Sequence, residues 1–257
     1  MNTKRTILSE KELNLIEQII IKHGTIVNFV QIYSILKSKI TRQSTRNLVN
    51  KLSKNGWLVR IKKGLYFVAG LESRGVISVH YFKIAQILVK ESYISCESAL
   101  QHHGMFDQLL KTIVSVSLKR YPIKKIQNNE FKFIKVKKDN YYGWQEERIE
   151  NHVVKIASPE KALLDLLNFG RNVYYIDLVL EKLQDYHKDI NLDKLVEFSN
   201  KQSITVQRIL GFIMDKLTLD SSKIHNKIKN KKNCSYMSND SKKFNAKWRL
   251  YYHKSFK

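Results

Sequence analysis

Residues 41–68, TRQSTRNLVNKLSKNGWLVRIKKGLYFV, contain the pattern that decides the fold of the first part of the chain. Within this stretch four residues recur at the spacing of one helical face: Thr45, Leu48, Val49 and Leu52. This spacing predicts a helix from about Thr41 to about Lys54, with its apolar stripe buried in a core. The dipeptide Asn55-Gly56 follows and predicts the end of the helix.

The other side of this predicted helix carries amides and cations. Seven residues lie opposite the apolar stripe or beside it: Arg42, Gln43, Arg46, Asn47, Asn50, Lys51 and Lys54. Amide side chains pair bidentately with adenine edges, and arginine does so with guanine. No carboxylate is expected on this face, so the pattern favours a surface that contacts bases.

Two extended segments follow the helix and are joined by a short connection. Residues 57–61 and 65–68 are rich in aromatic and β-branched side chains, which predicts a β-hairpin. The connection Lys62-Lys63-Gly64 suits a type I turn followed by a bulge. The tip of the hairpin therefore carries two lysines, and Arg60 lies beside them.

Two more helices are expected before residue 41. Ser9 is a suitable cap for a helix over residues 10–22, and a second helix is expected over residues 28–36. The inward side of the first helix is predicted to carry Leu13, Ile16, Ile19 and Ile20.

Three helices followed by a hairpin describe a winged helix-turn-helix domain, whose third helix enters the major groove of DNA. The predicted DNA-binding residues fall into two groups, with Arg42 in addition. Base edges are expected to be contacted by Gln43, Arg46, Asn47 and Asn50. Phosphates are expected to be contacted by Lys51, Lys54, Arg60, Lys62 and Lys63. A winged helix that serves only protein contacts is the alternative.

The charge distribution favours a polyanionic partner. The chain has 257 residues and a formal net charge of +23, and no acidic residue occurs between Glu17 and Glu72, where ten Lys and Arg residues do. A lysine-rich composition explains the cations but not the missing acids, and such a field attracts phosphate backbones. Double-stranded operator DNA is expected rather than RNA, because this segment lacks the surface aromatics that single-strand binding uses.

The rest of the chain predicts an α+β fold, with a mixed α/β region followed by helices. Strands are expected over residues 93–95, 112–118, 131–137 and 153–157, and helices over 79–90, 97–103, 159–169, 173–187, 191–198 and 203–217. Three parts of the chain are therefore predicted: a winged-helix domain over residues 1–70, a mixed α/β and helical domain over residues 75–222, and a basic tail over residues 223–257.

Two segments of this region resemble elements of a known family. Residues 93–104, YISCESALQHHG, resemble the element Y-I-S-x-x-S-A-L-x-x-H-G of the AbiEi family. Residues 154–167, VKIASPEKALLDLL, resemble its element I-A-x-x-E-K-A-L-L-D-L. The stretch from Gly56 to Tyr66 also looks like the winged helix of that family, so the resemblance covers about residues 8–170.

AbiEi proteins are antitoxins and transcriptional repressors of type IV toxin–antitoxin (abortive infection) systems, which act in phage defence. The resemblance implies that the chain represses its own operon, with pairing on inverted repeats. It also implies a cognate nucleotidyltransferase-type toxin as partner. The alternative is an interaction protein that masks a toxin without binding DNA, and a third interpretation is a nuclease, for which no cluster of metal-binding carboxylates is evident.

No residue pattern indicates an enzyme, and no cofactor, catalytic residue or metal site is predicted. Glu160 and Lys161 are expected to serve the start of a helix and a surface contact, and Asp165 lies near the opposite face from Glu160. His102 and His103 are neighbours and lack the i, i+4 spacing with which two helical histidines bind one metal.

Composition excludes several other classes. Two cysteines are too few for a disulfide framework, and no apolar run reaches the length of a membrane span, so a cytoplasmic protein without membrane contact is expected. The tail after residue 223 combines eleven cations with aromatics such as Trp248 and Tyr251. It is predicted either to contact nucleic acid or a partner, or to be a solvated tail with a small docking strand at 248–252.

Overall fold

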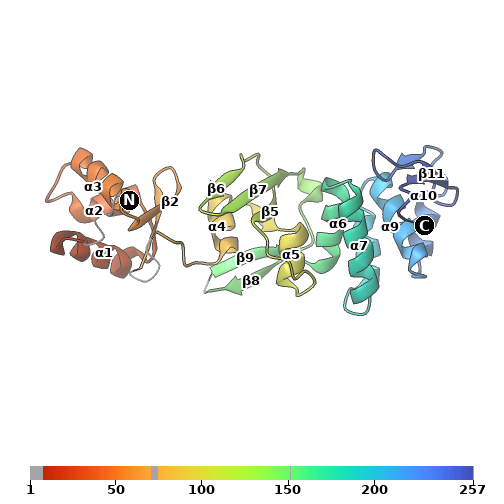
Figure 1. Ribbon diagram of the computed structural model, residues 1–257, viewed down its shortest axis with the longest axis horizontal. Coiled ribbons are helices and arrows are strands. Elements are labelled where there is room, and N and C mark those ends of the chain that lie inside the picture. The colour runs from red at the N-terminus through yellow and green to blue at the C-terminus, as the bar shows by residue number, and fades with distance from the viewer. Residues whose placement is uncertain (1–7, 71–74, 151, 257) are drawn as a thin grey trace. The chain divides into compact units, whose positions relative to one another are not determined.

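The computed structural model describes residues 8–70, 75–150 and 152–256. The described chain is a mixed α+β protein in two compact units, residues 1–84 and 85–257, and the boundary falls inside helix α4 (Tyr81–Leu88) (Figure 1). Among the described residues, no helix combines the length and the hydropathy that a membrane crossing requires.

In the described residues of unit 1, three helices and one antiparallel sheet precede helix α4. The elements of unit 1 before this boundary helix are α1 (Glu10–His23), β1 (Ile26–Asn28), α2 (Phe29–Leu36), α3 (Arg42–Lys54), β2 (Leu58–Lys62) and β3 (Leu65–Val68). The predicted helices and the hairpin are all present, close to their predicted bounds. Strand β1 was not predicted, and it pairs with β3 to give the strand order β1-β3-β2.

Each helix of unit 1 begins at a side chain that satisfies a free backbone N–H. The caps are Ser9, Asn28 and Thr41, which accept from the N–H groups of Glu12, Gln31 and Ser44. Because a helix start leaves its first amides without partners, these caps fix where each helix begins. The hairpin turns at Gly64, whose φ of 74° is the left-handed conformation that glycine adopts without strain.

The core of unit 1 partly differs from the prediction. Val49 and Leu52 of α3 are buried as expected, together with Trp57 and Leu58. In α1, however, the buried apolar residues are Leu15, Ile16 and Ile19, whereas Leu13 and Ile20 are 43% and 41% exposed. The prediction that Leu13 and Ile20 face inward is therefore wrong. The helix is rotated so that Leu15 enters the core in their place.

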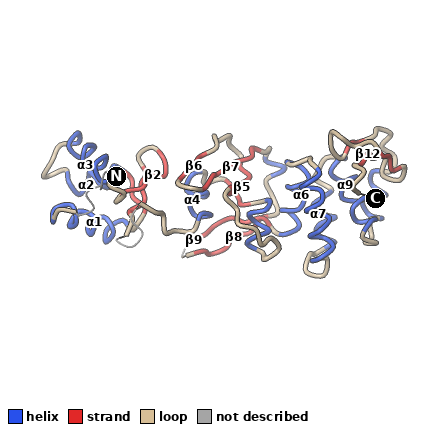
Figure 2. The backbone as a smooth tube through the Cα atoms, viewed as in Figure 1, coloured by secondary structure: helices blue, strands red, loops and turns tan. Residues whose placement is uncertain are grey.

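Unit 2 is built on a six-stranded mixed sheet. Its strands are β4 (Ser92–Ile94), β5 (Thr112–Ser117), β6 (Lys124–Ile126), β7 (Asn129–Lys135), β8 (Trp144–Ile149) and β9 (His152–Ala157). The order is β6-β7-β5-β4-β9-β8, in which β5 with β7 and β4 with β9 are parallel and the other pairs are antiparallel. Figure 2 shows the strands β8 and β9 side by side at one edge. Within this sheet, the two strands that the sequence did not predict are β6 and β8, and both lie at its edges.

Helix α6 is the centre of the helical part of unit 2. The helices before the tail are α5 (Cys96–His102), α6 (Pro159–Phe169), α7 (Val173–Tyr186), α8 (Leu192–Ser199) and α9 (Ile204–Lys216), with the 3-10 turn η1 (Lys138–Asn140) before β8. Helix α6 contacts the other four, and all its residues from Glu160 to Leu167 are buried. Ser158 caps α6 and Pro159 opens it, as predicted.

The basic tail folds onto α9. It contains α10 (Ser222–Ile228) and a three-stranded sheet of β10 (Ser235–Tyr236), β11 (Lys243–Asn245) and β12 (Leu250–Tyr252), in the order β10-β12-β11. The indole of Trp248 is almost completely buried and lies over Gly211, where a Cβ atom would come within 2.1 Å of the ring. Strand β12 lies within the predicted docking segment, so the tail is an ordered part of unit 2.

Candidate nucleic-acid interface

The outward face of α3 carries the side chains that were predicted to contact DNA. Arg42, Gln43, Arg46, Asn47, Asn50, Lys51 and Lys54 are all exposed. On the opposite face, Thr45, Val49 and Leu52 are buried. The helix is therefore fixed by its apolar side, and the polar side is accessible.

Several of these side chains are held in place by their neighbours. The Gln43 amide donates to the Asn47 side-chain oxygen over 3.2 Å, and the Arg46 guanidinium donates to the Gln43 oxygen over 3.2 Å. Arg42 lies 6.0 Å from the ring centroid of Phe29 and 5.9 Å from that of Tyr33. These contacts order the polar face, and exposed cation–π contacts of this kind are worth about 0.5–1 kcal/mol.

One carboxylate does reach this face, contrary to the prediction. Glu12 of α1 lies 2.8 Å from the Lys51 ammonium. Burial raises the pKa of Glu12, but hydrogen bonds from Lys51 and from Ser9 outweigh this effect and leave the pKa below its ordinary value. Glu12 also belongs to the capping box with Ser9, a pattern visible in the sequence, but its contact with α3 depends on the tertiary fold.

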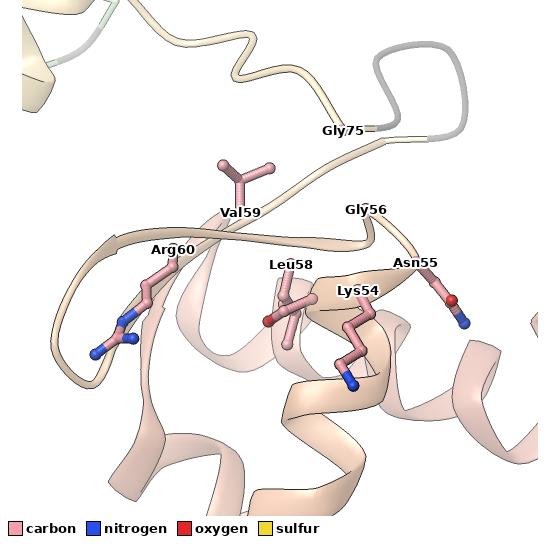
Figure 3. Close-up of a pocket in the computed structure, with 8 residues that line it drawn as sticks. Lys54, Asn55, Gly56, Leu58, Val59, Arg60 and Gly75 are labelled. Atoms are coloured by element: carbon pink, nitrogen blue, oxygen red, sulfur yellow. The ribbon is translucent and has the colours of Figure 1, made fainter. Parts of the chain in front are cut away.

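The hairpin residues lie beside the end of α3. Arg60 and Lys63 are exposed, and Lys62 is half-buried. A pocket of about 450 Å³ lies between the end of α3 and β2, and its lining includes Lys54, Asn55, Gly56, Leu58 and Arg60. In Figure 3 the cationic side chains of Lys54 and Arg60 lie on either side of Leu58. The structure thus brings one cation of the helix, Lys54, and one of the hairpin, Arg60, to neighbouring positions, and the role of the predicted cations in DNA binding stays a prediction.

A second cluster of polar side chains is buried inside unit 2. The Asp165 carboxylate accepts from the Tyr93 hydroxyl over 3.1 Å and from the Ser95 hydroxyl over 2.7 Å, and it pairs with the Lys161 ammonium. Lys161 and Asp165 are 1% and 0% exposed. The prediction that Lys161 makes a surface contact is therefore wrong. Its ammonium also lies 4.7 Å from the ring centroid of Tyr142.

Burial dominates the electrostatics of this cluster. It raises the pKa of Asp165 despite the opposing effect of Lys161, and it raises the pKa of Tyr93 well above its ordinary value. It also raises the pKa of the Cys96 thiol, and the Asp165 charge adds to this rise. A thiol kept protonated is a poor nucleophile. The arrangement is that of a structural polar core that joins β4 to α6.

Glu160 serves the start of helix α6, as predicted, and it also contacts the start of helix α8. Its carboxylate accepts from the Ser158 hydroxyl over 2.6 Å and from the backbone N–H of Asn191 over 3.1 Å, and it pairs with Lys194 at 3.2 Å. Burial raises the pKa of Glu160, but these hydrogen bonds outweigh it and lower the pKa overall. Glu160 therefore links the start of α6 to the start of α8.

The adjacent histidines also differ from the prediction, because His103 lies just beyond the end of α5. His102, His103 and Glu147 each offer a ligand atom within 4.8 Å of the others. His102 Nε2 lies 2.6 Å from Glu147, and His103 Nε2 lies 2.8 Å from the Ala157 carbonyl oxygen. The spacing argument applies to two residues of one helix, and here only His102 belongs to α5. In the present geometry they join the end of α5 to β8 and β9 by hydrogen bonds.

Comparison with known proteins gives the fold only. No family model and no curated protein matches the chain. A solved structure with a similar fold is the RV2827C protein from Mycobacterium tuberculosis, with a TM-score of 0.68 and 12% sequence identity. The match covers 97% of this chain and 93% of that protein. The similarity therefore extends over both units and the tail.

Proposed function

We propose that residues 8–70 form a winged helix-turn-helix domain that binds double-stranded operator DNA, with α3 in the major groove and the β2–β3 hairpin along the backbone. The observation that carries this proposal is the outward face of α3. It exposes three amides and four cations of its own helix together with the Ser44 hydroxyl, and no carboxylate of α3, while the opposite side is buried. Such a surface can contact base edges and phosphates together.

We further propose that the whole chain is the antitoxin of a type IV toxin–antitoxin system and represses its own operon. This part rests on the resemblance of residues 93–104 and 154–167 to elements of the AbiEi family. In the fold, Tyr93 and Ser95 of the first segment contact Asp165 of the second. The toxin to be neutralised is of the nucleotidyltransferase type.

Two experiments test the proposal. Fluorescence anisotropy with the DNA upstream of the gene should give binding that weakens steeply with salt, with a log–log slope of about −0.9 per phosphate contacted. Absence of binding to any duplex at low salt would overturn the DNA-binding role. Co-expression with the protein encoded by the neighbouring gene should relieve that protein's toxicity. Relief without duplex binding would instead favour the toxin-masking alternative.

A further inference from the structure

The sheet of the basic tail presents three aromatic rings in a row. Tyr236 of β10, Tyr251 of β12 and Phe244 of β11 are direct partners in the strand register. The rings of Tyr236 and Tyr251 are stacked, with centroids 4.6 Å apart and planes 9° apart. The Phe244 ring follows at 4.9 Å from Tyr251. We call these three residues the aromatic row.

Both ends of the aromatic row are accessible. Tyr236 and Phe244 lie on the two outer strands of the sheet and are 57% and 47% exposed. The other side of the sheet supplies the packing on α9, where the ring of Tyr252 lies 4.9 Å from that of Phe212. The side chains that attach the sheet to the core are therefore different from those of the aromatic row. The aromatic row does not serve that attachment.

Two pockets that share residues adjoin Tyr236. The first, of about 310 Å³, is lined by Tyr236 itself together with Arg171, Ser238 and Asn239. The second, of about 350 Å³, is lined by Arg208, Lys231 and Lys232. Both include Ser235, the residue before Tyr236. The exposed ring of Tyr236 thus borders the first pocket, which contains Arg171, and the neighbouring second pocket contributes three more cationic side chains.

Arg208 gives the second pocket a fixed positive charge. Its side chain is 2% exposed and donates to the Ser235 hydroxyl and to the Lys231 carbonyl oxygen, each over 2.9 Å. Both acceptors are neutral, and within residues 8–70, 75–150 and 152–256 no carboxylate pairs with Arg208. A buried charge without a counter-ion is costly, and an anion in the pocket would compensate it.

The surroundings have the same sign of charge. Residues 223–257 contain eleven Lys and Arg residues and a single acid, Asp240. Exposed cations near the sheet include Lys231, Lys232, Lys242, Lys243 and Arg249, and also Lys247, which pairs with Asp215. Stacking rings within a cationic surface are the combination by which proteins bind single-stranded nucleic acid.

We propose that the aromatic row and its two pockets bind single-stranded RNA, with a base stacked on Tyr236 and a phosphate beside Arg208, Lys231 and Lys232. Bases within a duplex are stacked on both faces, so an exposed ring end selects unstacked bases. RNA supplies such bases in its loops and ends, whereas cellular DNA is chiefly a duplex, so RNA is the nucleic acid that offers this site its ligand. This site is separate from the α3 face and does not depend on duplex DNA binding.

The test is fluorescence anisotropy of the full chain with a labelled single-stranded RNA of about 12 nucleotides, a length within the usual range for one such site. Tyr236→Ala should weaken binding roughly 5- to 150-fold, the effect of losing one stacked base. Tyr236→Phe should keep the affinity within about twofold, because the ring is retained. Lys231→Ala combined with Lys232→Ala should lower both the affinity and its salt dependence.

Controls separate this site from other effects. Tyr174→Ala removes a tyrosine that is 50% exposed elsewhere in unit 2 and should leave RNA binding unchanged. Arg46→Ala should weaken duplex DNA binding and not RNA binding, so the two sites can fail independently. Unfolding curves confirm that each variant folds. The proposal is overturned if the native chain binds no single-stranded RNA, or if Tyr236→Ala binds as the native chain does.

Discussion

The hydroxyl of Ser95 donates to the carboxylate of Asp165 over 2.7 Å, although the two residues lie 70 positions apart in the chain. The same carboxylate accepts from Tyr93 and pairs with Lys161, and the cluster is closed to solvent. Asp165 is therefore the point at which β4, the start of α5 and α6 are joined by polar contacts.

The first prediction concerns this carboxylate. Asp165→Asn should lower the free energy of unfolding of unit 2 by about 3–5 kcal/mol, because Lys161 would keep a buried charge without its counter-ion. Urea unfolding measures the effect, with Asp177→Asn on the exposed side of α7 as the control. The double variant Lys161→Met with Asp165→Leu should be more stable than Asp165→Asn. A loss below about 1 kcal/mol for Asp165→Asn would contradict a charged pair.

The second prediction concerns pH and Glu12. Its pKa is lowered in the folded chain, so the interaction stabilises unit 1 above the unfolded pKa of about 4.3 and is lost as the pH falls through the lower folded value. Glu12→Gln keeps a side chain that can complete the capping box but removes the charge. Its stability should therefore vary less between about pH 5 and pH 2 than that of the native chain. Equal pH dependence for both, in thermal melts, would show that Glu12 is not the titrating group.

The third prediction separates the roles of two cations in unit 1. Arg46→Ala should reduce the preference for operator over random duplex by about 1–3 kcal/mol, because arginine on α3 is expected to contact a base edge. Lys63→Ala at the hairpin tip should weaken binding to both duplexes alike. Lys188→Ala, an exposed lysine of unit 2, serves as the control. Equal losses on both duplexes for Arg46→Ala would count against a base contact.

The fourth prediction concerns the attachment of the tail. Gly211→Ala should destabilise unit 2 by about 1–3 kcal/mol or more, because its Cβ would come within 2.1 Å of the Trp248 ring. Trp248→Ala should cost about 3–5 kcal/mol through the lost burial and the lost hydrogen bond of its Nε1 to Asp215, which is 2.7 Å long. Chemical denaturation measures both changes, with Lys188→Ala at an exposed position of unit 2 as the control.

Local signals in the sequence predicted most of the fold. Helices that begin at Ser9, Thr41 and Ser158 have caps at fixed distances from an apolar periodicity, so their starts could be predicted. The buried face was predicted correctly for the helix after Thr41 and only in part for the helix after Ser9. The edge strands β6 and β8 were not predicted. In β8 only half-buried and exposed residues occur, so burial leaves no alternating pattern in its sequence.

The sites differ in how much of them could be predicted. The outward face of α3 follows from helical periodicity alone, and the exposed residues agree with it. Helical periodicity does not predict the two ion pairs. The pair Lys51–Glu12 forms only because helices α1 and α3 pack against each other. The pair Lys161–Asp165 is buried only because other elements cover helix α6 on all sides. The aromatic row depends on the register of three short strands, which no local pattern specifies.

The position of Trp248 has a consequence for how the protein is made. The surface of helix α9 at Gly211 stays uncovered until the indole of Trp248, which lies 37 residues later in the chain, packs against it. Unit 2 therefore cannot complete its core before residues 248–252 have left the ribosome, whereas the core cluster of unit 1 lies within residues 15–68 and can form during translation. The amino-terminal unit is thus expected to be folded while the growing chain is still tethered.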